Sequence, residues 1–282
     1  MPSRRSFLSL AVPGLALAVP PARAQATVEW RTPAAVAPRV SYQAFHSPAA
    51  GTRVSFHLYV PAAHAQPGGR RYPVVYWLHG SGGGVPGILP LARLVDAAIE
   101  AGQVPPMLVV FVNGLRMGMY VDWMSGTVPM ETVIVRDLVG HVDATYRTVA
   151  AREGRLLDGF SMGGYGAARL GFKFPELFGA VSIIGAGPLQ AVYGGDRANF
   201  RVVSPSRHAA DNAERIARES RVRMVIGDRD ETYAKNEAFH EHLERLGIPH
   251  AWIVLPGVGH DPMAVLEALG DRHWAFYRAA FR

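Results

Sequence analysis

Residues 156–166 read Leu-Leu-Asp-Gly-Phe-Ser-Met-Gly-Gly-Tyr-Gly, and this stretch decides the fold. A short apolar run enters Gly-x-Ser-x-Gly, and small residues that suit the start of a helix follow it. The pattern predicts a nucleophile elbow, in which Ser161 lies on a strained strand-to-helix turn with its hydroxyl exposed. Gly159 and Gly163 flank the serine because the two chain segments pass too close together for side chains. The bare pattern also arises by chance in a chain with 30 glycines, so the flanking strand and helix carry the interpretation.

A serine becomes a good nucleophile when a base takes its proton and a third group holds that base. In the architecture that the elbow predicts, the partners follow in the order Ser, acid, His, each after a later strand. Val222–Ile226 is expected to be a strand, and two carboxylates, Asp228 and Asp230, follow it. His260 lies in a Gly-rich loop after the next expected strand. Ser161, His260 and one of the two acids are therefore the candidate catalytic triad; the other acid is expected to hold its turn.

A glycine-rich run, His79-Gly80-Ser81-Gly82-Gly83-Gly84, follows the expected buried strand Tyr72–Leu78. Glycines let backbone N–H groups approach a substrate carbonyl closely. The amides of Ser81 and of Met162, the residue after the nucleophile, are the predicted donors to the oxyanion. A phosphate-binding loop is the competing interpretation, but no Gly-Lys-Ser or Gly-Lys-Thr follows, and the Gly-x-Gly-x-x-Gly spacing with a later acid is missing.

These motifs and several others resemble those of the esterase D-type ("putative esterase") family of α/β-hydrolases. That family includes feruloyl and acetylxylan esterases, S-formylglutathione hydrolases, enterochelin esterases and the antigen 85-type mycolyltransferases. The resemblance runs from Val40 to the C-terminus. The motifs that carry it are His79-Gly80-Ser81-Gly82-Gly83, Gly159-Phe160-Ser161-Met162-Gly163-Gly164, Gly227-x-x-Asp230, Gly259-His260-Asp261, the stretch from Tyr120-Val121-Asp122-Trp123 to Glu131-Thr132, Val142–Arg147, Ser204-Pro205 and Asp211-Asn212-Ala213.

The resemblance implies a Ser-Asp-His hydrolase or acyltransferase that needs no metal and no cofactor. It favours Asp230 over Asp228, because it places the acid three residues after the glycine. The acid is expected to hold the tautomer of His260 and to stabilise the imidazolium without itself taking a proton. The resemblance does not fix the acyl group or the alcohol, because one fold hosts many substrates.

Substrate contacts are expected from loops that follow the strands. His79 and Gly80 adjoin the predicted oxyanion hole, and His79 is expected to brace that loop rather than to act as a base. The insertion 113–130 carries Tyr120 and Trp123, whose rings can stack on a phenolic or sugar group. Aromatic residues of long loops also commonly pack on their own loop, so both interpretations stay open for these two side chains.

The first 24 residues predict an export signal. Ser3-Arg4-Arg5-Ser6-Phe7-Leu8 is a twin-arginine motif, a modestly apolar run over 10–19 follows, and Ala22-Arg23-Ala24 provides a cleavage site. The run is shorter than the roughly 20 apolar residues of a membrane span, so a removable leader is predicted. The expected partner is the bacterial twin-arginine export machinery; an ordinary secretory leader is the alternative. Either leader predicts a periplasmic or secreted protein without stable membrane insertion.

The composition excludes several functions. The sequence has no cysteine, which excludes disulfides, a lipoprotein cysteine, a cysteine nucleophile and thiolate metal sites. The formal net charge is +6, and three of the arginines belong to the leader. The remaining excess of basic residues is small and scattered along the sequence. Nucleic-acid binding needs a clustered basic face, which the sequence does not indicate. Glu237, His240 and Glu244 share a helix but match no metal-binding motif, so a solvated polar face is the preferred interpretation.

The order of expected elements predicts one α/β domain with the α/β-hydrolase fold over residues 40–282, after a Pro- and Ala-rich arm at 25–39. Two antiparallel strands come first, and strands then alternate with helices, which predicts a mostly parallel central sheet covered on both faces. The expected strands are Val40–His46, Thr52–Val60, Tyr72–Leu78, Met107–Val112, Gly154–Leu157, Ala180–Ile184, Val222–Ile226 and His250–Leu255. The expected helices are Leu91–Ala101, Glu131–Ala144, Gly163–Phe174, Tyr233–Leu246 and one from Pro262 onward.

Together these features predict an exported serine esterase that hydrolyses carboxylic esters through an acyl-enzyme intermediate. Acylated sugars and small aromatic esters are the expected substrates of such an exported enzyme. An acyltransferase is one alternative, because an alcohol in place of water uses the same machinery. A non-catalytic binding scaffold is the other, and it predicts a broken triad or a filled oxyanion loop, neither of which the sequence shows.

Overall fold

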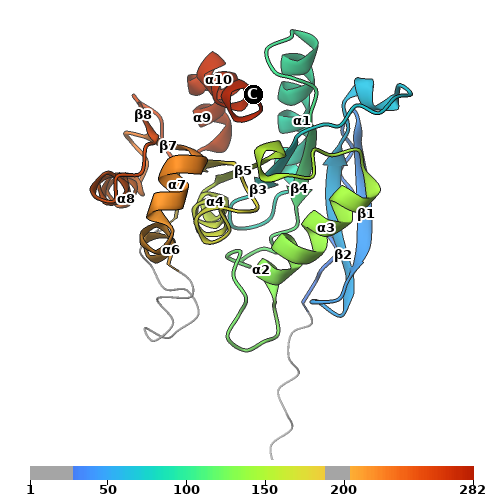
Figure 1. Ribbon diagram of the computed structural model, residues 1–282, viewed down its shortest axis with the longest axis horizontal. Helices are drawn as coiled ribbons and strands as arrows, with labels where there is room; N and C mark the ends of the chain where they lie inside the picture. Colours follow the sequence, from blue (N-terminus) through green and yellow to red (C-terminus); the bar gives the residue numbers. More distant parts are fainter. Residues whose placement is uncertain (1–27, 188–203) are drawn as a thin grey trace, which may run out of the picture.

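The computed structural model describes residues 28–187 and 204–282, so the predicted leader lies outside the described residues. Eight strands form one sheet in the order β1-β2-β4-β3-β5-β6-β7-β8 (Figure 1). β1 pairs with β2 and β2 with β4 in antiparallel fashion, and all the other pairs are parallel. The strands are β1 (Val40–Ser47), β2 (Thr52–Tyr59), β3 (Val74–Leu78), β4 (Leu108–Val112), β5 (Arg155–Phe160), β6 (Ala180–Ile184), β7 (Arg221–Gly227) and β8 (Ala251–Leu255).

Helices cover both faces of the sheet (Figure 1). One face packs against α1, α9 and α10, and the other against α2, α3, α4 and α6 to α8. The helices are α1 (Val85–Glu100), α2 (Met130–Thr132), α3 (Val139–Thr145), α4 (Met162–Lys173), α6 (Pro205–Asp211), α7 (Ala213–Glu219), α8 (Tyr233–Arg245), α9 (Pro262–Leu269) and α10 (Asp271–Ala280), with the π-helix η2 (Val133–Leu138) and the 3-10 turns η1 (Ala62–Ala65) and η3 (Arg152–Gly154).

β3 and β4 are apolar along their whole length because both of their faces are buried. In β3, Val74, Tyr76 and Leu78 enter the core on the α4 side, whereas Val75 and Trp77 enter the core on the α1 side. All five residues are less than 9% exposed. The predicted fold class, an α/β domain with a mostly parallel sheet between two layers of helices, is therefore confirmed.

The structure corrects three expected helices. α1 begins six residues before the expected Leu91, because Pro86 lies in its first turn, where a missing N–H costs nothing, and Pro90 is accommodated within it. The expected helix Glu131–Ala144 contains the π-helical segment η2. The C-terminal helix is two helices, which Gly270 separates with a φ of 51° and a ψ of −131°.

The N-terminal arm lies against the sheet in the part that the structure describes. Trp30 is 6% exposed, and its carbonyl accepts a hydrogen bond from Ser55 of β2. The amide of Ala35 donates to the ring of His57. No helix within residues 28–187 and 204–282 combines the length and apolar character that crossing a bilayer requires.

Candidate active site

The turn between β5 and α4 has the geometry of a nucleophile elbow. Ser161 adopts a φ of 57° and a ψ of −116°, a conformation that is strained for a residue with a side chain. A Cβ atom at Gly159 would lie 2.3 Å from the carbonyl oxygen of Gly163, and one at Gly163 would lie 1.8 Å from that of Leu78. Both flanking glycines are therefore required by backbone contacts, as the sequence pattern predicts.

The structure brings the three predicted triad residues together from three loops at the carboxyl edge of the sheet. The hydroxyl of Ser161 lies 2.9 Å from Nε2 of His260. Nδ1 of His260 lies 2.7 Å from Oδ2 of Asp230. With the proton on Nδ1, the imidazole donates to the carboxylate, and Nε2 is free to accept from the serine.

The surroundings set the ionisation of this chain of side chains. The hydrogen bond to Asp230 raises the pKa of His260, and this effect exceeds the opposing effect of burial. Burial acts to raise the pKa of Asp230, but hydrogen bonds from His260 and Thr232 outweigh it, so the pKa is lowered. These shifts favour the ionised carboxylate of Asp230 and make the imidazole of His260 a stronger base than that of an ordinary histidine.

Asp228, the rival acid, lies elsewhere. Its carboxylate accepts a hydrogen bond of 2.7 Å from the amide of Gly257, in the loop between β8 and α9. Asp230 instead is 4% exposed and accepts from both the amide and the hydroxyl of Thr232 as well as from His260. The two acids therefore divide the roles that the sequence leaves open: Asp228 holds the loop that carries His260, and Asp230 contacts the ring.

The glycine-rich loop after β3 lies against the elbow. A Cβ atom at Gly80 would be 3.3 Å from the Cβ atom of Ser161. Ser81 follows in the exposed turn, and Met162 is the first residue of α4, where a helix leaves its N–H without an internal acceptor. The two predicted oxyanion donors thus belong to segments that meet at the nucleophile.

The buried ring of His79 holds the glycine-rich loop after β3 in place. The ring is 8% exposed, its Nδ1 donates to the carbonyl of Gly80, and its Nε2 accepts from the amide of Gly114. Burial lowers the pKa of His79, which keeps the ring neutral for this arrangement. Both ring nitrogens are occupied by backbone groups, so the ring holds the loop and offers no free nitrogen to a substrate.

Tyr120 does not take the substrate-binding role that was one of the two interpretations of the sequence. Its side chain is completely buried, its hydroxyl donates to the carbonyl of His79, and its ring packs where Gly114 and Gly166 leave room. It therefore supports the oxyanion loop from within the protein and does not reach a substrate. Trp123, on the same insertion, is 41% exposed while its Nε1 donates to the carbonyl of Gly118. Its ring remains accessible.

Two residues that the sequence analysis did not assign to the site fix its geometry. Arg169 of α4 is 1% exposed, donates to the carbonyl of Tyr120 and pairs with the carboxylate of Glu131. Lys173 binds the other oxygen of Glu131 at 2.6 Å. This cluster fastens the insertion 113–130 to the helix that begins at the nucleophile. In the sequence, the signal for this anchoring role is an arginine, Arg169, within the run of small residues that begins α4.

The cluster of potential metal ligands within the described ranges is Asp230, Glu231 and His260. Two of its members already bind each other in the hydrogen-bonded chain, so the cluster belongs to the site described above. The helix with Glu237, His240 and Glu244 has a different use: His240 bonds to His250 and stacks on Trp252.

A protein-family model described as "Putative esterase" matches residues 47–281 of the chain. The chain belongs to this family. The resemblance inferred from the motifs is therefore confirmed, and the expected enzyme class, a carboxylic ester hydrolase, is the class of this esterase family. The match begins near the end of β1 and includes every loop that contributes to the candidate site.

Similar proteins carry related names. This member of the esterase family is 29% identical over 259 residues to Esterase Rv1288 of Mycobacterium tuberculosis, which covers 79% of this chain and 56% of that protein. The chain thus spans about half the length of this curated relative. A ferulic acid esterase structure superposes with a TM-score of 0.74 at 22% identity, covering 86% of this chain and 98% of the other. An S-formylglutathione hydrolase from Agrobacterium tumefaciens gives 0.71 at 20% identity, covering 86% and 95%. These two likenesses confirm the α/β-hydrolase fold.

Proposed function

We propose that this protein hydrolyses carboxylic esters with Ser161 as nucleophile, His260 as general base and Asp230 as the residue that orients the base. The observation that carries the proposal is the unbroken hydrogen-bonded chain from hydroxyl to imidazole to buried carboxylate, at 2.9 and 2.7 Å. Membership of an esterase family supports the same chemistry. Such a chain activates serine because the base accepts the proton as the new bond forms.

In the first half-reaction, Oγ of Ser161 attacks the ester carbonyl and its proton passes to Nε2 of His260. The amides of Ser81 and Met162 donate to the oxygen that becomes negatively charged. The tetrahedral intermediate collapses, the alcohol leaves with the proton from His260, and the acyl group stays on Ser161. In the second half-reaction, His260 takes a proton from water, the hydroxide adds to the acyl carbonyl, and the acid leaves as Ser161 regains its proton.

For the substrate, we propose small aromatic esters and acylated sugars. Trp123 supports this choice, because a ring that is 41% exposed on the insertion beside the oxyanion loop can stack on a phenolic or sugar ring. A structurally similar protein bears the name ferulic acid esterase. Comparing kcat/KM for p-nitrophenyl acetate, methyl ferulate and an acetylated xylo-oligosaccharide tests the choice; a preference for long aliphatic esters over all three would overturn it.

A fluorophosphonate probe tests the nucleophile. The wild-type protein should be labelled once, at Ser161, and Ser161→Ala should remain unlabelled with kcat lower by about 10⁶-fold. Ser41→Ala, an exposed serine of β1, is the matched control and should keep both properties. Labelling at another residue, or activity that survives in Ser161→Ala, would contradict the proposal. Adding an alcohol acceptor to the same assay measures acyl transfer against hydrolysis.

Export through the twin-arginine machinery is proposed from residues 1–24. The paired arginines Arg4 and Arg5, the apolar run and the Ala-x-Ala site support it. Replacing both arginines by lysine should retain the protein in the cytoplasm of a bacterial host, while the unaltered protein is found in the periplasm or medium. Cell fractionation measures the difference, and equal export of both forms would favour an ordinary secretory leader.

A further inference from the structure

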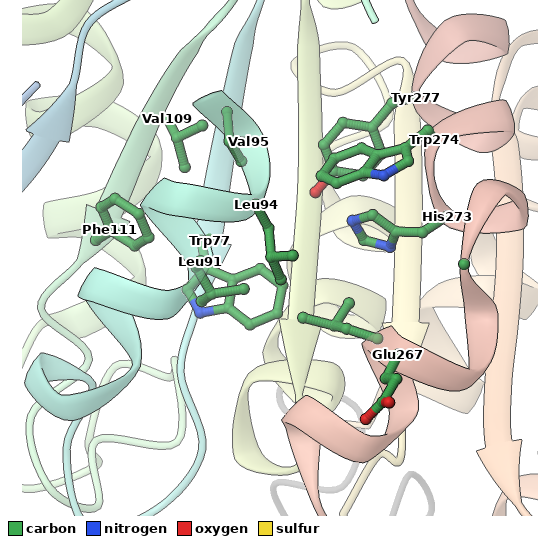
Figure 2. A pocket seen from close by; sticks show the side chains of 12 residues that line it. Trp77, Leu91, Leu94, Val95, Val109, Phe111, Glu267, His273, Trp274 and Tyr277 are labelled. Carbon is green, nitrogen blue, oxygen red and sulfur yellow. The ribbon is translucent and has the colours of Figure 1, made fainter. Parts of the chain in front are cut away.

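A cavity lies away from the triad, between α1, the strands β3 and β4, and the pair α9–α10 (Figure 2). Its volume is about 180 Å³. Ser161, Asp230 and His260 are absent from its wall. The residues that line it are Trp77, Leu91, Leu94, Val95, Val109, Phe111, Leu266, Glu267, Gly270, His273, Trp274 and Tyr277.

The size and lining of the cavity suit a single aromatic ring. Apolar cavities of roughly 150 Å³ stay free of water and accept a benzene-sized molecule. Here Trp77 and Leu91 from one side face Trp274 and Tyr277 from α10 on the other (Figure 2). Aromatic walls favour an aromatic guest, because offset and edge-on ring contacts add to the gain from burial.

His273 gives the cavity a polar group in a fixed state. Its ring is 5% exposed, and its Nδ1 lies 2.9 Å from Nη2 of Arg223. A guanidinium only donates, so Nδ1 accepts and the ring proton sits on Nε2. Burial and the neighbouring Arg223 lower the pKa of His273 well below its ordinary value, so the ring stays neutral. The described part of the chain supplies no acceptor for the Nε2–H.

The groups behind His273 are already engaged. Arg223 donates to the hydroxyl of Ser182 at 2.8 Å, and the hydroxyl of Tyr277 donates to Asp158 at 2.7 Å. The indoles of Trp77 and Trp274 also carry donors and no acceptors. The inner wall thus offers hydrogen-bond donors, while the carboxylate of Glu267, in an exposed residue, disfavours an anionic guest.

We propose that this cavity binds a small neutral aromatic molecule with one hydrogen-bond acceptor, which accepts from Nε2–H of His273. An aryl ketone of the size of acetophenone has the required chemistry. The site is independent of the ester-hydrolysing machinery, so binding there does not require the proposed function. The ring of the guest lies among the aromatic side chains, and its carbonyl oxygen accepts the hydrogen bond from Nε2–H of His273.

Titration calorimetry with acetophenone, ethylbenzene and benzoate tests the proposal, with quenching of tryptophan fluorescence as a second signal. Acetophenone should bind to one site, ethylbenzene more weakly, and benzoate not at all. His273→Asn keeps an acceptor for Arg223 near the position of Nδ1, but the shorter side chain places no N–H at the position of Nε2. It should therefore weaken acetophenone binding about fivefold, the worth of one neutral hydrogen bond, and leave ethylbenzene binding unchanged. Equal losses for both molecules would overturn the role of His273.

Blocking the cavity provides the second variant. Leu94 is 38% exposed, so Leu94→Trp can fill the cavity without disturbing a sealed core, and it should abolish binding of both molecules. Binding that survives this change would place the site elsewhere and overturn the proposal. Crystals of the wild-type protein grown with 4-bromoacetophenone give a test that does not depend on the folding of a variant. The bromine atom should appear between Trp77 and Trp274. Its absence at a ligand concentration that saturates the protein in solution would refute the site.

Discussion

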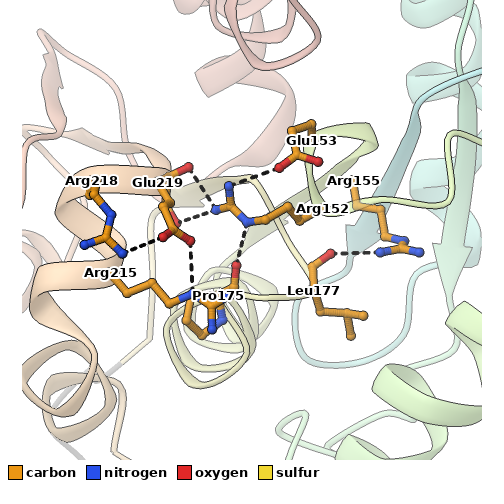
Figure 3. A network of polar contacts seen from close by, with 9 residues as sticks. Arg152, Glu153, Arg155, Pro175, Leu177, Arg215, Arg218 and Glu219 are labelled. Atoms are coloured by element: carbon orange, nitrogen blue, oxygen red, sulfur yellow. Dashed lines mark hydrogen bonds and ion pairs between the residues drawn. The ribbon is translucent and has the colours of Figure 1, made fainter.

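The two edges of the parallel sheet differ in what their loops contain. At the carboxyl edge, Ser161 holds a positive φ of 57°, the side chain of His260 is 22% exposed, and the loop at Ser81 is glycine-rich and open. At the amino edge, Arg152 donates to the carbonyls of Pro175 and Glu219, where the chain approaches the starts of β5, β6 and β7 (Figure 3).

The loops at the carboxyl edge hold the groups proposed to react with the substrate, whereas the contacts at the amino edge stabilise the fold. Strain and exposed polar groups at the carboxyl edge cost free energy, and they persist because buried neighbours hold them. The amino edge contains a largely buried ion pair, since Arg155 pairs with Asp143 and also donates to the carbonyl of Leu177. Changes at the first edge should therefore act on rate, and changes at the second on the free energy of unfolding.

Next to the loss of the nucleophile itself, the largest effect on rate expected at the carboxyl edge comes from Asp230→Asn. An amide in that place can hold the wrong tautomer of His260, and kcat should fall by about 10⁴-fold. Asp228→Asn is the matched control, because its amide oxygen can still accept from Gly257, and its kcat should stay near that of the wild type. If only Asp228→Asn abolished turnover, the assignment of the two acids would be wrong.

Gly163→Ala should be an exception to this separation of rate from stability, because Gly163 lies at the carboxyl edge and yet the substitution acts on folding. The new Cβ would lie 1.8 Å from the carbonyl oxygen of Leu78, so backbone must move, and we expect a loss above about 4 kcal/mol. Gly140→Ala is the matched control: it is an exposed position of α3 with nothing within 4 Å, and it should gain about 0.5–1 kcal/mol. Urea unfolding monitored by circular dichroism measures both, and a Gly163→Ala protein as stable as the wild type would contradict the packing argument.

Arg152→Ala, at the amino edge, should lower the free energy of unfolding without changing kcat. It leaves the carbonyls of Pro175 and Glu219 without their charged donor, and a loss of about 2–4 kcal/mol in the free energy of unfolding is expected. Arg218→Ala, in the same network but 70% exposed, should cost under about 1 kcal/mol (Figure 3). Neither change should alter kcat. A large loss of kcat in Arg152→Ala at a temperature where the protein is folded would show that the edges are coupled.

The strands and the elbow were predictable because their constraints are local. Each of the eight expected strands overlaps one of the eight strands of the described sheet, and Gly159 and Gly163 are needed within a few residues of Ser161. The break at Gly270 was readable in principle, since a glycine followed by an aspartate at a helix start is a local stop signal. The early start of α1 is harder to predict, because a proline such as Pro90 normally ends or breaks a helix pattern, whereas α1 contains it.

The wall of the site was not predictable in the same way. Whether Tyr120 or Trp123 faces solvent depends on how the insertion 113–130 folds back on α4, and no period in the sequence encodes that. Arg169 decides it through a pair with Glu131, 38 positions away in sequence, and a contact of that kind exists only in three dimensions. The choice of Asp230 rested on a family spacing, because Asp228 fits the same turn chemistry.

The smallest expected effect concerns pH and tests the electrostatics of the carboxyl edge alone. Nε2 of His260 accepts a proton only while the ring is neutral, so kcat/KM should fall as pH drops through the pKa of His260. Because the hydrogen bond to Asp230 raises that pKa, the midpoint should lie above the roughly 6.5 of an ordinary histidine. In Asp230→Asn the charge is gone, and the midpoint of the residual activity should move to lower pH. Arg152→Ala, at the opposite edge, should leave the midpoint in place. If the midpoint moves in Arg152→Ala, or stays unchanged in Asp230→Asn, the pKa of His260 is set by a group other than the carboxylate of Asp230.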